Sequence, residues 1–228
     1  MQAINNEWFK HPYLNMAYKH GGNAQWQGYQ QATGGGFNRG GIEGPVELPV
    51  GMELWKLSQN RVGLGDQKLS EWWCSRKPYR QQNGDLKRCV EEAALNGVPL
   101  HVYIRVASCV KINWNTLDNL QIIRLKYPVK ALWGKFAPMN LMEAKNPKYW
   151  TDKNDRRLAG MKKAGYDPAV GDAVLGGMNS YQLFIPGLLG NHVQMLGECD
   201  SQDNSAIKNL LGIRDLPRGP KDLSWRRS

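Results

Sequence analysis

The sequence has no long apolar run, and this absence excludes one class of protein. No apolar stretch approaches eighteen residues, so we expect no helix that spans a membrane and no membrane partner. The first residues lack a charged flank followed by an apolar segment, so we expect no signal peptide. The expected location is therefore the cytoplasm, or a target cell reached by export without a cleavable signal.

Paired metal-ligand spacings are also missing. The four cysteines and four histidines are scattered, and no two cysteines stand in a C-x-x-C arrangement. Structural zinc sites draw their ligands from short paired spacings, so we expect no bound metal. Nothing resembles a small disulfide-stapled scaffold. The cysteines are expected to be mostly reduced core residues: Cys74, Cys89, Cys109 and Cys199.

Acidic residues are fewer than basic ones, and the net charge is +10. Such a charge favours polyanionic partners, including nucleic acid. Solubility and a solvated helix face explain the same charge without any partner. No helix-turn-helix, RNP or zinc-finger pattern accompanies it. A non-catalytic nucleic-acid-binding or assembly protein therefore stays open as an alternative function.

The chain divides into an N-terminal arm with a linker over residues 1–45 and a compact domain over 46–228. Residues 21–44 are rich in Gly, Gln and Asn, and repeated glycine disfavours regular structure because of its conformational entropy. We expect a long loop there. The arm before it is a place where a cognate inhibitor or a delivery protein would dock. Hydrophobic residues make up 41% of the sequence, which is enough for a core.

Short strands and few helices are expected within the domain, without regular alternation, which favours an α+β fold. The clean alternation from Val98 to Val106 predicts a half-buried strand. The apolar spacing over 85–95 predicts a helix that ends before Gly97. A second helix is expected over 155–164. Strands are expected over 52–57, 129–136, 182–185 and 192–197, and further short apolar elements over 69–74 and 119–125.

One stretch, 158–186, carries a recognisable order of elements. Gly165 is placed to end a helix, and Tyr166 and Asp167 follow it. A Gly-Gly turn precedes a strand that presents Gln182 and is stopped by Pro186. This order resembles the NAD-binding core of ADP-ribosyltransferase-fold enzymes, in which the strand bears the catalytic acid. Gln182 occupies the position of that acid, as in a subgroup of bacterial toxins of this fold.

The resemblance implies a split β-sheet core with flanking helices and NAD as a substrate. The implied activity is that of a bacterial or phage effector toxin. It cleaves the nicotinamide–ribose bond and transfers ADP-ribose to a macromolecular acceptor, either protein or nucleic acid. Hydrolysis of NAD without transfer is the close alternative. An amide such as that of Gln182 orients the ribose but takes no proton. The acceptor is therefore water, or a group that another residue activates.

Further family positions imply further site residues. Lys56 stands where the family usually has Arg, and it offers a phosphate a point charge rather than a fork. Ser70 is placed to bond the ribose or the carboxamide, and Glu71 is the nearest base. The remaining cofactor contacts implied by the resemblance are Trp72 or Trp73 as an aromatic wall, and Tyr166.

Each of these residues also has an ordinary structural interpretation. Gln182 is equally well an exposed strand residue, and Lys56 a solvated strand lysine. Taken singly, the tryptophans are more typical of core packing than of ligand walls. Tyr166 and Asp167 fit a simple turn. The functional interpretation depends on the order of these residues along the chain.

Overall fold

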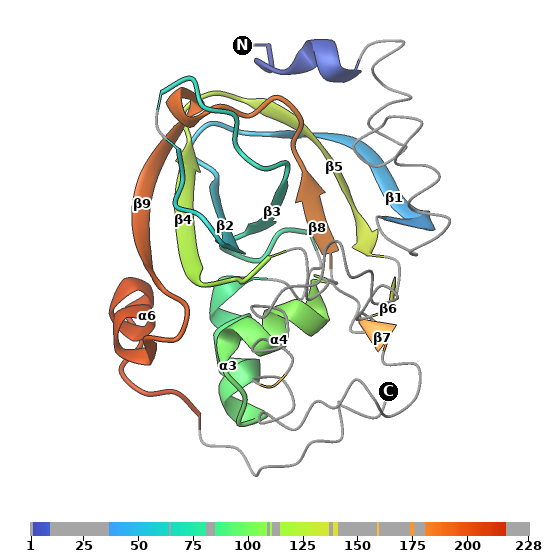
Figure 1. Cartoon of the computed structure of the whole chain (residues 1–228). Coiled ribbons are helices and arrows are strands. Elements are labelled where there is room, and N and C mark those ends of the chain that lie inside the picture. Colours follow the sequence, from blue (N-terminus) through green and yellow to red (C-terminus); the bar gives the residue numbers. More distant parts are fainter. Residues whose placement is uncertain are drawn as a thin grey trace, which may run out of the picture.

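The computed structural model describes residues 2–9, 37–63, 65–80, 85–108, 110, 115–136, 139–140, 159, 174–175 and 181–217. Within them the chain is mixed, with a seven-stranded antiparallel sheet and helices beside it, which confirms the α+β class. No helix among the described residues is long and apolar enough to cross a membrane. Figure 1 shows the strands curling around a common interior, with α3 (Leu86–Leu95) and α4 (Leu100–Ala107) below them.

The sheet order is β1-β5-β8-β3-β2-β4-β9, and every neighbouring pair is antiparallel. The strands are β1 (Phe37–Leu48), β2 (Glu53–Ser58), β3 (Trp72–Ser75), β4 (Asn119–Leu125), β5 (Val129–Phe136), β8 (Tyr181–Phe184) and β9 (Val193–Asp200). The short strands β6 (Met139–Asn140) and β7 (Val174–Leu175) pair separately. The remaining elements are the 3-10 turns η1 (Asn6–Phe9) and η2 (Gly190–His192), and helix α6 (Asn204–Leu211).

Two buried clusters lie on opposite faces of this sheet. All seven strands contribute to the first, through residues such as Leu48, Leu54, Trp73 and Leu183. We call this side the inner face, because a single cluster fed by every strand requires the sheet to curl around it. On the outer face, alternate residues of β2, β3 and β4 pack against α3, α4 and α6.

The first of these helices forms where the sequence predicts it. Asp85 caps α3, since its carboxylate accepts a hydrogen bond from the Arg88 backbone N–H at 3.1 Å. Gly97 follows the helix with a φ of 64°. The strands expected over 52–57, 129–136, 182–185 and 192–197 are also confirmed, to within a few residues, as β2, β5, β8 and β9.

The strand expected over 98–106 is wrong, because this segment forms helix α4. Leu100, Tyr103, Ile104 and Ala107 all pack into the outer-face cluster, and their spacing is that of one helix face. A half-buried strand would turn the intervening Arg105 toward solvent. Its side chain is instead buried and donates to the carbonyl oxygens of Val110 and Asn115, at 3.1 and 2.8 Å.

The loop expected over 21–44 is wrong from Phe37 onward, because strand β1 begins there. This strand lies at the edge of the sheet, and its pairing with β5 shifts register between Phe37 and Ile42 and again between Ile42 and Pro45. Glycine and proline are tolerated at edges and irregularities of this kind. Apart from Ala159, the expected helix over 155–164 falls outside the described residues, as do Tyr166 and Asp167.

Candidate functional site

Three adjacent strands carry most of the residues that the resemblance singles out. Lys56 lies on β2, Trp72 and Trp73 lie on β3, and Gln182 lies on β8. Ser70 and Glu71 immediately precede β3. Because β3 is hydrogen-bonded to β8 on one side and to β2 on the other, these segments are brought together from across the sequence. Tyr166 falls outside the described residues, so the structure does not place it.

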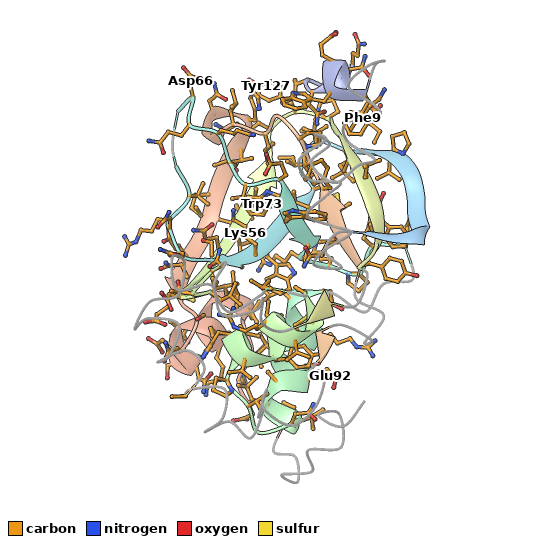
Figure 2. The ribbon with its side chains drawn as sticks, turned by 45° about the vertical axis from the view of Figure 1, so that its right-hand side comes forward. Phe9, Lys56, Asp66, Trp73, Glu92 and Tyr127 are labelled. Atoms are coloured by element: carbon orange, nitrogen blue, oxygen red, sulfur yellow. The ribbon has the colours of Figure 1, made fainter. Side chains whose placement is uncertain are left out.

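Adjacent strands do not guarantee a shared face, and here the register separates the residues. Trp73 pairs with Leu183, and both belong to the inner-face cluster. The Lys56 Nζ lies 4.4 Å from the Trp73 ring centroid, so Lys56 is on the inner face too. Figure 2 labels the two residues next to each other. Gln182 is one residue from Leu183 and therefore points to the outer face. The structure thus brings Lys56 and Trp73 together but leaves Gln182 on the opposite side of the sheet.

Lys56 is a half-buried cation with a perturbed titration. Burial lowers the pKa of its ammonium to about 8, while the nearby negative charge of Glu71 acts in the opposite direction. The Trp73 ring beneath it supplies a cation–π contact. A lysine with its pKa lowered to this range can exchange a proton near neutral pH, and its ammonium form offers an anion a point charge.

Glu71 is held beside Lys56 by its own backbone and by a second lysine. Its carbonyl oxygen accepts a hydrogen bond from the Ile185 N–H at 2.7 Å, which ties it to the end of β8. Its carboxylate lies 2.7 Å from the Lys68 Nζ, in an ion pair whose two side chains are both partly exposed. Since Glu71 is two residues before Trp73, strand alternation places it toward the inner face. Its carboxylate remains accessible from solvent.

The other residues near the start of β3 have structural roles. Trp73 is completely buried, and its indole N–H donates to the Ser70 carbonyl oxygen at 2.7 Å. Trp72 is edge-on to Phe184 at 5.0 Å, on the outer face. Trp73 contacts Lys56 but is itself completely buried, and Trp72 lies on the other face, so the core-packing interpretation fits both rings. Ser70 is exposed, and its hydroxyl oxygen accepts from the Trp72 N–H at 3.4 Å.

Two further polar residues continue from Lys56 across the inner face, and no sequence pattern predicted them. Lys56 pairs with Gln121 of β4, and Gln121 pairs with Glu198 of β9. The Gln121 side chain is fully buried and donates to the Asn60 carbonyl oxygen, while its own amide oxygen accepts nothing from the described residues. Glu198 forms an ion pair with Arg61 at 3.2 Å. No motif links these positions, because only the strand register aligns them.

No group of three or more His, Cys, Asp or Glu side chains capable of holding a metal occurs in the part of the chain that the structure describes. The three cysteines placed there are unpaired, and burial raises the pKa of the Cys74 thiol to about 12. The site therefore consists of Lys56, Glu71 and Gln121 on the inner face.

Comparison with protein-family models, with curated proteins and with solved structures returned no match.

Proposed function

We propose that this protein is an NAD-consuming enzyme of the ADP-ribosyltransferase type, with its reacting groups on the inner face. One observation carries the proposal. Lys56 and Glu71 lie close enough for their charges to interact, on adjacent strand segments and beside a buried tryptophan. This arrangement offers a cation for the phosphates of the dinucleotide and a carboxylate for the cation that forms on the ribose.

The proposed reaction begins with cleavage of the bond between the ribose C1′ and the ring nitrogen of nicotinamide. The electron pair goes to the nitrogen, so neutral nicotinamide leaves and positive charge develops on the ribose. The Glu71 carboxylate stabilises that charge. A nucleophile of the macromolecular acceptor then bonds to C1′, and its proton passes to Glu71. Water in place of the acceptor gives hydrolysis.

In this proposal Glu71, and not Gln182, takes the role of the catalytic acid of the family. Its side chain is buried on the outer face, where the same strand contributes Phe184 to a small cluster with Phe9 and Leu132. Gln182 therefore supports the strand, and Glu71 replaces it as the residue beside the ribose. A carboxylate also removes the difficulty that an amide takes no proton from the acceptor.

The test measures nicotinamide release from NAD and incorporation of labelled ADP-ribose into macromolecules. The informative variant is Glu71→Gln, with Glu91→Gln as its matched control. Glu91 is also partly exposed and is also ion-paired to a lysine, Lys87, one helical turn away. We expect Glu71→Gln to lower nicotinamide release by about 100-fold or more, and Glu91→Gln to leave it unchanged.

The possible results separate the alternatives. Release of nicotinamide without labelled product identifies a glycohydrolase of the same chemistry. Equal rates for wild type and Glu71→Gln would remove Glu71 from the site. If the wild-type protein releases no nicotinamide from NAD between about pH 6 and about pH 9, where Lys56 changes charge, the proposal is rejected.

A further inference from the structure

A second group of side chains lies at the other end of the inner face, on β5, on β8 and after β3. Trp133 and Tyr181 are stacked, with ring centroids 4.4 Å apart and planes inclined by 13°. Tyr79 meets Trp133 edge-on at 6.1 Å. The guanidinium of Arg80 lies 5.6 Å from the Trp133 ring and 5.7 Å from the Tyr79 ring. We call these four residues the aromatic cluster.

The aromatic cluster is graded from buried to exposed. Trp133 is 3% exposed, Tyr79 and Tyr181 are half-buried, and Arg80 is exposed. The indole N–H of Trp133 is buried and finds no acceptor among the described residues. A buried donor without an acceptor is unfavourable by about 1–3 kcal/mol. Core packing alone explains Trp133 but not a cationic rim above half-exposed rings.

Arg80 is also held in an unusual backbone conformation. Its φ is 49°, which is in the left-handed region that side chains other than glycine rarely adopt. The conformation is unfavourable by about 1 kcal/mol, and glycine would relieve it. Residues held in such conformations cluster at binding and catalytic sites. The strained backbone and the unpaired indole are independent observations on the same cluster.

We propose that the aromatic cluster stacks a base of single-stranded nucleic acid, and that this polymer is the macromolecular acceptor. Stacking platforms for single strands combine aromatic rings with cations that track the phosphates. The net charge of +10 favours a polyanion over a free nucleotide. The binding stands on the cluster alone, whereas the role as acceptor rests on the proposed function.

The cluster and the Lys56 site share one face, which places the base and the reacting groups on the same side. Trp133 pairs with Leu183, Leu183 pairs with Trp73, and Lys56 lies over Trp73. Three strand spacings separate β5 from β2 in the sheet order, which is about 14 Å along the sheet. A strand anchored at the cluster therefore has neighbouring nucleotides within reach of Glu71.

The test measures binding of labelled twelve-nucleotide strands of dT and of rU by fluorescence anisotropy over a series of salt concentrations. The variants are Tyr181→Leu, Tyr79→Leu and Arg80→Gly. The matched control is Arg214→Gly, which removes an exposed arginine beyond α6 and changes the charge equally. We expect Tyr181→Leu to weaken binding about tenfold or more, through loss of stacking. Arg214→Gly lowers affinity only through the change in net charge.

Arg80→Gly separates binding from folding. It removes the guanidinium, so we expect binding to weaken about fivefold. The relieved backbone strain offsets the loss of the contacts with the two rings, so we expect the thermal midpoint to stay near that of the wild type. An arginine with a purely structural role would instead change the thermal midpoint and leave binding as it is in Arg214→Gly. If Arg80→Gly binds the strands as Arg214→Gly does, and Tyr79→Leu and Tyr181→Leu bind them as the wild type does, the aromatic cluster is not a base-binding site.

Three further results distinguish the base-binding site from the proposed enzymatic function. Binding of AMP as tight as binding of the twelve-nucleotide strands would overturn the polymer as the occupant. Strand binding that depends on the cluster, without any nicotinamide release, would leave the base-binding site standing and reject the enzyme and the acceptor role. Nicotinamide release with labelled protein and no labelled strands would reject the acceptor role alone.

Discussion

Successive residues of the same strands serve two very different faces. On the outer face of β2 and β4, Trp55, Leu57, Leu120 and Ile122 are buried beneath the helices. One residue away, Lys56 and Gln121 face the other side. The outer face is apolar and closed, whereas the inner face includes a cation and an amide oxygen without a donor from the described residues. Both faces therefore hold a buried apolar cluster, and the polar side chains of the candidate site lie on the inner face.

The largest expected effect tests the outer face. Leu120 is completely buried in the cluster between the sheet and the helices. Leu120→Ala should lower the free energy of unfolding by about 2–5 kcal/mol, since it removes buried area and leaves a cavity. Urea denaturation followed by circular dichroism measures this. A loss below about 1 kcal/mol would show that the helices do not pack on the sheet as described.

The second prediction compares two cations, one on each side of the sheet. Arg105 is 1% exposed and donates to carbonyl oxygens, so Arg105→Met should lower the free energy of unfolding by about 3 kcal/mol. Lys56→Met should change it by less than about 1 kcal/mol, because burial already disfavours the charge. Both variants are measured by urea denaturation. Equal losses would remove the distinction between a structural and a functional cation.

The third prediction concerns the face of Gln182. Because its side chain is buried on the outer face, on the strand that also carries the buried Phe184, Gln182→Glu places a carboxylate where it is poorly solvated. We expect a loss of about 2 kcal/mol near neutral pH that diminishes in acid, as the carboxyl is protonated. Urea denaturation near neutral pH and in acid measures this loss in the free energy of unfolding. A change below roughly 0.5 kcal/mol would instead indicate an exposed side chain.

The fourth prediction follows the pKa of Lys56, which burial lowers from 10.5 to about 8. Between these two pH values the unfolded chain binds the proton and the folded chain does not. The stability contributed through Lys56 therefore rises with pH in this window. Relative to Lys56→Met, the wild type should gain about 1–2 kcal/mol, allowing for solvent screening. Denaturation of both proteins across this range tests it, and parallel curves would contradict it.

The smallest expected effect is at the rim of the inner face. The ion pair between Arg61 and Glu198 joins side chains that are 83% and 21% exposed. Arg61→Ala should lower the free energy of unfolding by about 0.5 kcal/mol or less, and added salt should erase the difference. A loss above about 1 kcal/mol that does not depend on salt would show that this ion pair stabilises the protein as a buried contact does.

Local pattern predicted the elements whose periodicity had a single interpretation. The capped helix at Asp85 and the strand at Val129 are examples, since their apolar spacing fits one period only. The segment from Val98 to Val106 fits two periods, and its strand interpretation requires Arg105 to face solvent. Carbonyl groups several residues later in the chain instead surround this side chain.

The candidate site could be predicted only in part, because it depends on register. Order along the chain was enough to bring β2, β3 and β8 under consideration, and these strands are neighbours in the sheet. It did not decide which face each side chain takes, since a shift of one residue reverses every side chain. Lys56 and Gln182 therefore lie on opposite faces, although the strands that carry them are both adjacent to β3.

The sequence by itself determined the charge, the α+β class and the residue types available for chemistry, because these follow from composition and local periodicity. Only the tertiary structure decided that Lys56 lies over Trp73, beside Glu71 and Gln121. It alone also gathered Tyr79, Arg80, Trp133 and Tyr181. These contacts join residues far apart in the chain, and they form through strand pairing and burial, which no local pattern encodes.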